Sequence, residues 1–234
     1  MEKYYYLLLD IGSILFPLLF SFHPLENFSK KWKYLWPAIL IPAVIFIAWD
    51  SWFTTLGVWG FNPRYLTGIY FFNLPLEEVL FFICIPYACV FTYTAVNFFK
   101  KSEPSADNGL RITTALIVGL TALGIKYYSQ WYTTVTFLAT AAFLLFLILI
   151  IKPTYLGRFY FAFIFILIPF FIVNGVLTGT GLEEPVVWYN NSENLGIRML
   201  TIPVEDTFYG MLLLLMNVSI FEGLQRRSLN KTKS

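Results

Sequence analysis

Charged residues are scarce in this chain. Asp, Glu, Lys and Arg make up 13% of its 234 residues, which is about half of the roughly 25% found in soluble domains. Hydrophobic residues make up 58%, and the mean hydropathy is +0.66. This composition excludes an ordinary soluble domain and indicates a polytopic membrane protein.

Residues and motifs that bind metals or cofactors are nearly absent. Cys84 and Cys89 lie in one apolar segment, so we expect neither a disulfide nor a metal site from them. His23 stands alone. The chain lacks a glycine-rich dinucleotide motif, a Walker loop and Asp-rich diphosphate motifs. The last apolar segment contains no lysine, which excludes a retinal Schiff base there. We therefore expect no metal, no cofactor and no nucleic-acid partner.

Seven segments are apolar and long enough to cross a bilayer. They cover residues 4–22, 34–52, 75–98, 110–128, 131–151, 159–177 and 203–222. The fourth is the weakest, because its apolar stretch is short and rich in Thr and Gly. We expect an all-α fold, a polytopic membrane bundle of seven transmembrane helices.

The distribution of Lys and Arg predicts the orientation of these segments. Of the 16 Lys and Arg residues, four lie on the side of the N-terminus and twelve on the opposite side. Positive charge accumulates on the cytoplasmic side of membrane proteins. The N-terminus is therefore predicted outside and the C-terminus in the cytoplasm, with a bacterial cytoplasmic membrane as the expected location.

The sequence repeats at an offset of 128 residues. Leu-Pro-Leu-Glu-Glu at 74–78 returns as Ile-Pro-Val-Glu-Asp at 202–206. A single copy has a simpler interpretation, an ordinary helix start with proline and acids in its first turn. Two copies in register favour a functional site instead. The same offset aligns Phe61 with Tyr189, Asn62 with Asn190, and Gly68 with Gly196.

The repeat unit consists of three helices. The first repeat covers residues 1–99 and the second 130–226, while 100–129 form a polar linker with a connecting helix and 227–234 a basic tail. One connecting helix restores the orientation, so the two repeats are predicted to run parallel. Parallel repeats are related by an axis along the membrane normal and build their site at the repeat interface. Both acid pairs are therefore expected to face one site.

Four carboxyl groups form the predicted catalytic set: Glu77, Glu78, Glu205 and Asp206. Ionised carboxylates are costly at membrane depth, so they mark a functional site by default. Burial and a neighbouring like charge favour the protonated form of a carboxyl, which then acts as a general acid. An ionised member of the set stabilises a cation or accepts a proton. Adjacent residues on a helix diverge by about 100°, so one acid of each pair is expected to face the site.

Six further residues are predicted to contact a substrate: Asn62, Phe81, Phe82, Asn174, Asn190 and Tyr209. Phe81 and Tyr209 follow the first acid of each pair by four residues and so share its helix face. Aromatic faces stabilise a developing cation, although they also pack helices and face lipid. The asparagines either orient the acids by hydrogen bonds or cap turns.

Other charged residues near the motifs have open roles. Arg64 and Arg198 either pair with the acids or lie at the membrane interface. Asp10 and Asp50 have no acidic counterpart in the second repeat, and the offset of 128 aligns Asp10 with Leu138. Asp50 is close to the motif loop and is the better candidate for a supporting role.

The motifs at 61–68, 74–82, 174–179 and 201–210 resemble those of the integral-membrane, flavin-independent lycopene cyclases. That family includes heterodimeric bacterial enzymes, their fused single-chain form and the cyclase half of fungal bifunctional enzymes. The resemblance covers nearly the whole chain, and the two repeats look like the two heterodimer subunits joined by the fourth helix.

The resemblance implies a cofactor-independent isomerase, an intramolecular lyase in carotenoid biosynthesis. A linear carotenoid end group would close to a β-ionone ring by redox-neutral acid–base chemistry. The implied partners are lycopene and γ-carotene from the bilayer, membrane lipids and, as a further class, other carotenoid enzymes. The four acids named above match the family's motif and would be the acid–base set.

Two alternatives remain open. A related cyclase would use the same acids on another prenyl substrate, such as a C50 carotenoid or a non-carotenoid terpenoid. A transporter with a carboxylate relay would need a polar pathway to both sides. The inner halves of the third and seventh segments have almost no ionisable groups before Lys100 and Glu222, which argues against a transporter.

Overall fold

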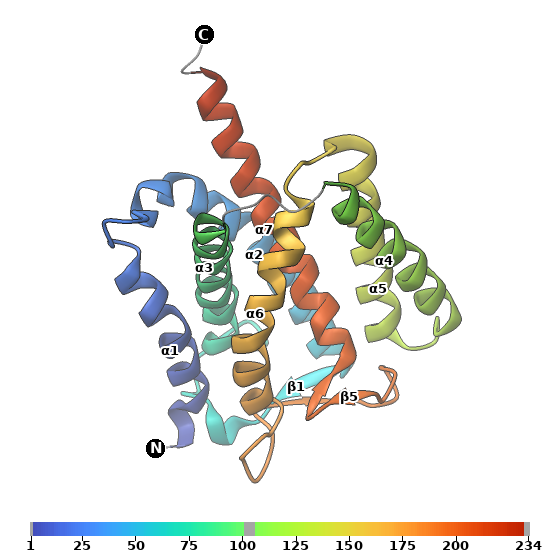
Figure 1. Ribbon diagram of the computed structural model, residues 1–234. Helices are drawn as coiled ribbons and strands as arrows, with labels where there is room; N and C mark the ends of the chain where they lie inside the picture. The colour runs from blue at the N-terminus through green and yellow to red at the C-terminus, as the bar shows by residue number, and fades with distance from the viewer. Residues whose placement is uncertain (1, 101–105, 232–234) are drawn as a thin grey trace. The chain divides into compact units, whose positions relative to one another are not determined.

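The computed structural model describes residues 2–100 and 106–231. Within them, seven helical segments are long and apolar enough to cross a membrane. Their helices are labelled in Figure 1 and are α1 (Tyr5–Phe20), α2 (Trp32–Leu56), α3 (Leu76–Phe99), α4 (Ala106–Lys126), α5 (Trp131–Phe146), α6 (Leu156–Leu177) and α7 (Val204–Lys231). The prediction of a seven-helix membrane fold is confirmed, including its weakest segment.

Helix ends differ from the predicted ones where polar residues continue a helix. α7 runs past the predicted end at Glu222 as far as Lys231, since a hydropathy pattern does not register polar residues that are good helix formers. α5 gives way to a π-helical turn, η4 (Leu147–Ile151), and Lys152 follows it in the left-handed conformation. The remaining short helices are the 3-10 turns η1 (Glu2–Tyr4), η2 (Phe28–Lys31) and η3 (Pro63–Tyr65).

Short strands form three two-stranded antiparallel sheets. The strands are β1 (Trp59–Phe61), β2 (Tyr70–Phe71), β3 (Leu74–Pro75), β4 (Val187–Tyr189), β5 (Arg198–Met199) and β6 (Ile202–Pro203), paired β1–β4, β2–β3 and β5–β6. Pro75 and Pro203 end β3 and β6. Each proline therefore lies directly before its helix, whereas the sequence had placed it in the first helical turn. A proline fits at this strand end because it needs no N–H partner there.

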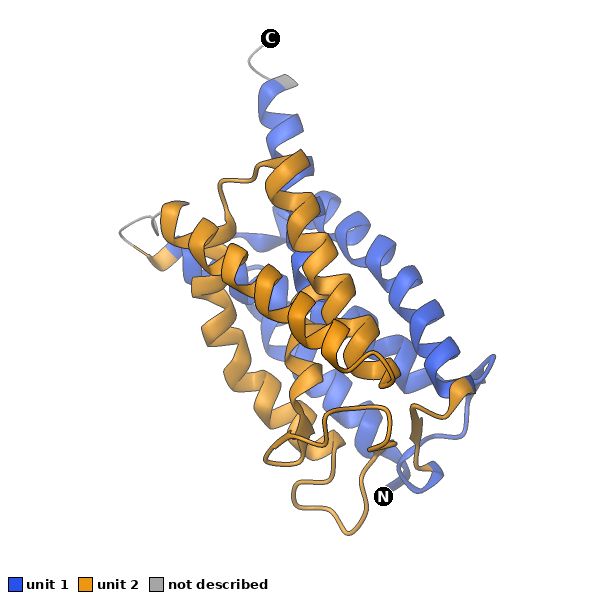
Figure 2. Ribbon diagram, turned by 90° about the vertical axis from the view of Figure 1, so that its right-hand side faces the viewer, with its two compact units in different colours: residues 1–55, 63–98, 213–234 blue, residues 56–62, 99–212 orange. Residues whose placement is uncertain are grey.

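The chain divides into two compact units, coloured separately in Figure 2. Unit 1 comprises residues 1–55, 63–98 and 213–234, and unit 2 comprises residues 56–62 and 99–212. The boundary therefore runs through α7 instead of following the repeats. The C-terminal part of α7, from residue 213 on, belongs to unit 1, where Glu222 accepts a hydrogen bond from Tyr93 at 2.6 Å.

Large aromatic side chains fill the core of unit 1. Phe28, Phe46, Phe82 and Tyr87 are fully buried. The ring of Phe28 packs edge-on against Tyr87 with the centroids 5.9 Å apart, and Phe82 packs on Phe46 at 6.0 Å. Such rings bury large areas at favourable geometries, and they hold α2 and α3 beside each other.

Small residues explain why α4 forms a stable helix in unit 2. A Cβ added to Gly109 would lie 2.7 Å from the backbone nitrogen of Gly157, so the backbones of α4 and α6 approach closely there. The hydroxyls of Thr113 and Tyr160 lie 2.7 Å apart across the same contact. Glycine contacts and interhelical hydrogen bonds drive helix packing in membranes. Thr113, one of the polar residues that weaken the apolar signal of this segment, thus makes one of its contacts, and Gly109 directly before the segment makes another.

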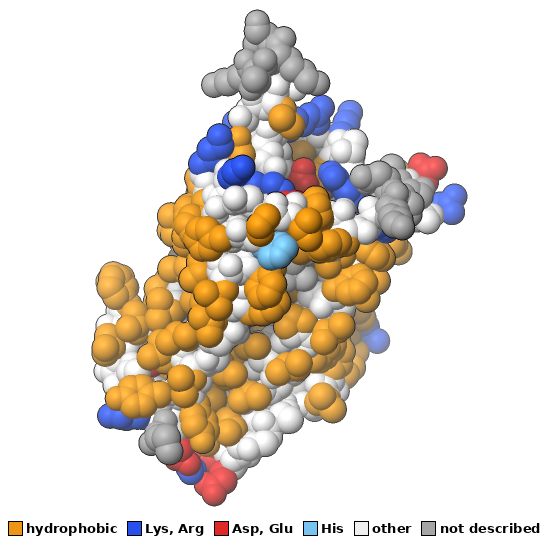
Figure 3. All heavy atoms as spheres, turned by 60° about the vertical axis from the view of Figure 1, so that its left-hand side comes forward, with side chains coloured by type: hydrophobic (Ala, Val, Ile, Leu, Met, Phe, Trp, Pro, Cys, Tyr) orange, Lys and Arg blue, Asp and Glu red, His pale blue; other side chains and the backbone are white. Residues whose placement is uncertain are grey.

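The helix surfaces suit a lipid environment. Figure 3 shows a face on which hydrophobic side chains cover most of the surface. On α1, the exposed side chains include Leu8, Ile11, Leu15, Phe16 and Leu19. Exposed apolar surface on this scale is typical of a protein that lies in lipid, so the chain is an integral membrane protein.

Candidate active site

Each acid pair follows a tight β-hairpin of the same construction. In the first repeat Tyr70 pairs with Pro75, and the backbone N–H of Leu76 donates to Ile69 at 2.8 Å. In the second repeat the same bonds join the residues 128 positions later: Arg198 with Pro203, and Val204 with Ile197 at 3.0 Å. The hairpin sets where α3 and α7 begin, so it also sets the positions of the acids in their first turns.

A strained residue lies at the tip of each hairpin. Phe72 and Leu200 have positive φ angles of 56° and 59°, a left-handed conformation that costs a non-glycine residue about 1–2 kcal/mol. Gly68 and Gly196 also have positive φ angles and precede the hairpins at the same spacing. The matching backbone conformations show that the repeat is structural as well as sequential.

The first acid of each pair is completely buried, and a backbone N–H donates a hydrogen bond to one of its two carboxyl oxygens. Oε1 of Glu77 accepts the backbone N–H of Thr67 at 2.7 Å, and Oε1 of Glu205 accepts that of Leu195 at 2.8 Å. In both residues Oε2 is buried without a hydrogen-bond partner among the described residues. In each glutamate one oxygen is thus fixed by a backbone N–H, and the other has no partner within the described part of the chain.

The second acid of each pair accepts a hydrogen bond from a tyrosine. Tyr6 of α1 donates to Oε2 of Glu78 at 2.5 Å, and Tyr132 of α5 donates to Oδ1 of Asp206 at 2.5 Å. Both tyrosines are buried. A buried carboxylate with a hydroxyl donor keeps its orientation, since hydrogen bonds to charged groups contribute about 1.5–3 kcal/mol.

The sequence analysis missed both tyrosines. They correspond at an offset of 126, because the second repeat has two more residues between its first helix and its acids: 74 positions separate Tyr132 from Asp206, against 72 for Tyr6 and Glu78. With this offset the partner of Asp10 is Thr136, not Leu138. Aligning the first helices by their tyrosines would have found the correspondence.

Two side chains donate hydrogen bonds to the second acid pair, and the residues at the matching positions of the first repeat have no hydroxyl to donate. Thr133 donates its hydroxyl to Oε1 of Glu205 at 2.6 Å, and Leu7 occupies the matching position. Tyr189 donates to Oδ2 of Asp206 at 2.9 Å. The residue that matches Tyr189 is Phe61, which has no hydroxyl. The two pairs therefore share a backbone but differ in polarity.

Aromatic rings pack beside the tyrosines that donate to the acids in each unit, and a substrate contact of Phe81, Phe82 and Tyr209 stays a prediction. In unit 1, the ring of Tyr6 packs edge-on against Phe81 with the centroids 6.3 Å apart, and Phe81 packs edge-on against the buried Phe82. In unit 2, Trp59 lies 5.1 Å from Tyr132 and 6.0 Å from Tyr209. Ring faces in this arrangement attract positive charge.

The strand pair β1–β4 in unit 2 is internally symmetric. Trp59 pairs with Tyr189, Gly60 with Trp188 and Phe61 with Val187. Gly60 thus pairs with its own repeat equivalent, and Trp59 and Phe61 each pair with the equivalent of the other. Asn62 donates its N–H to Val186 at 2.8 Å, and Asn190 donates to Val58 at 2.9 Å. This reciprocal pattern is what a local two-fold axis produces.

The asparagines make contacts that hold the loops. The amide of Asn62 donates to Glu184 at 2.8 Å, and Oδ1 of Asn190 accepts the N–H and hydroxyl of Ser192. Asn174 lies in α6, where its backbone oxygen accepts the hydroxyl of Thr178 at 2.8 Å. Of these contacts, that of Asn190 with Ser192 is of the turn-capping kind, and a direct role at a substrate stays a prediction for all three.

The two arginines also differ. Arg64 pairs with Glu2 at 2.7 Å. Arg198 donates to the backbone oxygen of Thr201 at 2.9 Å, lies over the ring of Tyr189 and acts electrostatically on Asp206. Arg198 thus places positive charge near the second acid pair.

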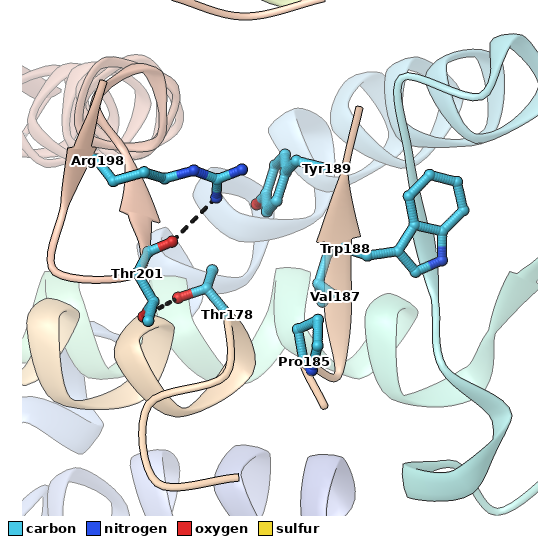
Figure 4. A pocket seen from close by; sticks show the side chains of 7 residues that line it. All are labelled: Thr178, Pro185, Val187, Trp188, Tyr189, Arg198 and Thr201. Atoms are coloured by element: carbon cyan, nitrogen blue, oxygen red, sulfur yellow. Dashed lines mark hydrogen bonds between the residues drawn. The ribbon is translucent and has the colours of Figure 1, made fainter. Parts of the chain in front are cut away.

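A pocket of about 280 Å³ opens in the loops of unit 2. Figure 4 shows Arg198, Tyr189 and Thr201 along its wall, together with Thr178, Pro185, Val187 and Trp188. Tyr189 connects this pocket to the acid pair, because its hydroxyl donates to Asp206. Among the described residues, no group of three His, Cys, Asp or Glu side chains is arranged to hold a metal ion.

The fold and these sites define an integral-membrane protein of two three-helix repeats, each with a buried carboxyl pair at a helix start. A family model described as lycopene cyclase matches residues 3–96 and 129–224. The chain therefore belongs to the lycopene cyclase family, which implies a carotenoid cyclase acting on a carotenoid substrate. No curated protein and no solved structure matched the chain.

Proposed function

We propose that the protein is a lycopene β-cyclase, which closes the linear end groups of lycopene to β-ionone rings without oxidation or reduction. The observation that carries this proposal is the pair of buried glutamates, each with one anchored and one unpartnered oxygen. Groups that protonate an alkene and remove a proton from a carbocation need this kind of dry, positioned acid and base.

The reaction consists of one proton added and one removed. A carboxylic acid protonates C2 of the terminal alkene, breaking its O–H bond and leaving a tertiary cation at C1. The neighbouring polyene double bond attacks C1 and closes a six-membered ring. A carboxylate then takes the proton from C6, which gives the β-ring. The product has the formula of the substrate, so the class is an isomerase, an intramolecular lyase that needs no cofactor.

We assign the proton-transferring role to Glu77 within the first acid pair and to Glu205 within the second. Their Oε2 atoms are the unpartnered ones, whereas Glu78 and Asp206 accept hydrogen bonds from tyrosines. The second acid of each pair then orients its neighbourhood and stabilises positive charge. The nearby rings of Phe81 and Tyr209 contribute to the same stabilisation.

The test is expression in a bacterium that accumulates lycopene, with the pigments separated by chromatography. Conversion of lycopene to γ-carotene or β-carotene supports the proposal, and the ratio of the two shows whether one or both ends close. Unchanged lycopene, with the protein present in the membrane, contradicts it. A C50 carotenoid supplied in the same assay then tests the alternative prenyl substrate.

A further inference from the structure

A chain of side-chain contacts in unit 2 leads from the pocket wall to the second acid pair. Tyr189 of β4 donates its hydroxyl to Oδ2 of Asp206 at 2.9 Å. The guanidinium carbon of Arg198, on β5, lies over the ring of Tyr189 at 5.4 Å from its centroid, which is within the range of a cation–π contact. All three residues belong to unit 2, so one compact unit contains the whole chain of contacts.

Two hydrogen bonds hold the guanidinium in place over this ring. Nη1 of Arg198 donates to the backbone oxygen of Thr201 at 2.9 Å, and Nη2 donates to Oδ1 of Asn191 at 2.6 Å. Figure 4 shows the arginine extending across the pocket from β5 toward Tyr189 on β4. A planar guanidinium donates in fixed directions and stacks on a ring, and the ammonium of a lysine does neither. The contacts of Arg198 therefore depend on the shape of its side chain as well as on its charge.

Asp206 is held at both of its carboxyl oxygens as a result. Tyr132 donates to Oδ1 at 2.5 Å, and Tyr189 donates to Oδ2. The two tyrosine rings are stacked, with their centroids 5.8 Å apart and their planes inclined by 18°. A rotation of the carboxyl group about its bond to Cβ would distort these hydrogen bonds, which need a narrow range of distance and angle. Tyr189 thus fixes the plane of a carboxyl group that Tyr132 alone would hold by one oxygen.

The residues of the first repeat cannot form an equivalent chain of contacts. The offset of 128 places a phenylalanine, a proline and a tyrosine where the second repeat has Tyr189, Asn191 and Arg198. The three first-repeat residues are Phe61, Pro63 and Tyr70. Phenylalanine has no hydroxyl to donate, proline has no side-chain amide to accept a hydrogen bond, and tyrosine is not a cation at neutral pH. The chain of contacts is therefore a feature of the second acid pair.

The β5–β6 hairpin does not need the arginine in order to form. The first repeat builds the same hairpin with Tyr70 at the matching position, because Tyr70 pairs with Pro75 as Arg198 pairs with Pro203. Both hairpins also have a residue with a positive φ angle at the tip. The side chain at this position is thus free to differ between the repeats as far as the hairpin is concerned. The contacts of Arg198 are better explained by the tyrosine ring that it covers.

We propose that Tyr189 and Arg198 are positioning residues of the cyclase. Tyr189 fixes the carboxyl group of Asp206, and Arg198 fixes the ring of Tyr189, so both act on the reaction through Asp206. This inference rests on the proposed function and adds two residues to the machinery of its second acid pair. A small displacement of a catalytic group costs rate, because such groups act only within a narrow geometry.

The first arm of the test observes Asp206 directly and needs no substrate. The full-length protein is produced with carbon-13 in the side-chain carboxyls of its aspartates and purified in lipid nanodiscs, and Asp206→Asn identifies the infrared band of this residue. We expect that band to shift in Arg198→Ala and in Tyr189→Phe, which keeps the ring and loses only the hydroxyl. Tyr70→Ala, at the position equivalent to Arg198, is the matched control and should leave the band in place. An unmoved band in both Tyr189→Phe and Arg198→Ala would overturn the proposal.

The second arm restores the missing group chemically. Arg198→Ala should lower turnover at saturating lycopene by about three- to tenfold, and Arg198→Lys should recover little of the loss. The pocket of about 280 Å³ opens at this side chain, so free guanidinium ion can enter the space that the side chain leaves. Millimolar guanidinium chloride should raise the turnover of Arg198→Ala several-fold, whereas potassium chloride at equal ionic strength should not. Neither salt should change Tyr189→Phe. Equal responses of Arg198→Ala to the two salts would overturn the role of Arg198.

The two arms separate this inference from the proposed function. A shifted Asp206 band in a protein that leaves lycopene unchanged would support the positioning roles and contradict the substrate. Ring closure by a protein whose Asp206 band stays unmoved in the Tyr189→Phe and Arg198→Ala variants would support the cyclase and refute the positioning roles.

Discussion

The acid pair of the first repeat and that of the second occupy the same backbone framework but have different neighbours. Glu77 and Glu205 are anchored by equivalent backbone N–H groups, and a tyrosine from the first helix of its repeat holds the second acid. Around this framework the first repeat adds a carboxyl, Asp10, and the second adds hydroxyl donors. The comparison teaches that one duplicated scaffold provides two electrostatic environments.

A proton donor and a proton acceptor have conflicting requirements. A donor must stay protonated near neutral pH, and an acceptor must stay ionised in the same apolar surroundings. Substitutions at a few positions, with Leu7 and Thr133 as one example, give the two pairs different polar neighbours without changing the hairpins.

The largest expected effect comes from removing the reacting carboxyls. Glu77→Gln and Glu205→Gln should each lower ring closure by about 10²–10⁴-fold, because an amide neither donates an acidic proton nor accepts one from the cation. Pigment ratios in lycopene-accumulating cells, normalised to the protein in the membrane, measure the effect. Glu183→Gln in the loop of unit 2 is the control. Full activity in both variants would remove the mechanism.

The next effect comes from the tyrosine donors. Tyr6→Phe and Tyr132→Phe each remove a hydrogen bond to a carboxylate, which is worth about 1.5–3 kcal/mol, so we expect turnover to fall about tenfold or more. Tyr160→Phe is the control, because its hydroxyl contacts Thr113 away from the acids. A rate assay in membranes measures all three. If Tyr6→Phe and Tyr132→Phe behave like Tyr160→Phe, the tyrosines are merely structural.

The acids and their hairpins were predictable because their signal is local. Two five-residue motifs at a fixed offset place Glu77 and Glu205 at helix starts, and the helices α3 and α7 begin one residue after the prolines. The seven membrane segments follow equally from runs of apolar residues. These features depend on neighbours in sequence.

Other features depend on contacts between distant residues. Tyr6 lies 72 positions before Glu78, and nothing in its own apolar segment distinguishes it from other aromatic residues. The division of α7 between two units also follows from packing, as with Tyr93 and Glu222. The asparagines had two interpretations from sequence because capping and catalysis use the same side chain.

A smaller effect should result from making the second pair more like the first. Thr133→Val removes the hydroxyl that donates to Glu205 but keeps the shape of the side chain and leaves the N–H of Leu195 in place. Losing one hydrogen bond of about 0.5–1.5 kcal/mol should slow turnover a few-fold, because the carboxyl group of Glu205 is then held by one donor fewer. The reciprocal variant, Leu7→Thr, should slow it by adding a donor beside Glu77. Faster turnover in either variant would mean that the difference in hydroxyl donors between the two pairs does not favour catalysis.

The smallest effect concerns the shared framework. Gly68→Ala and Gly196→Ala place a Cβ at positive φ with no atom within 4 Å, so the cost is backbone strain alone, about 1–2 kcal/mol. Each should lower the melting temperature by a few degrees and leave the pigment product unchanged. Gly12→Ala in α1, equally open but helical, is the control and should be neutral or stabilising. Equal losses at the two hairpins would mean that the repeats differ in side chains and not in backbone. An effect at one hairpin alone would mean that the backbone framework itself has diverged. The difference between the two acid pairs would then come from the backbone as well as from their side-chain neighbours.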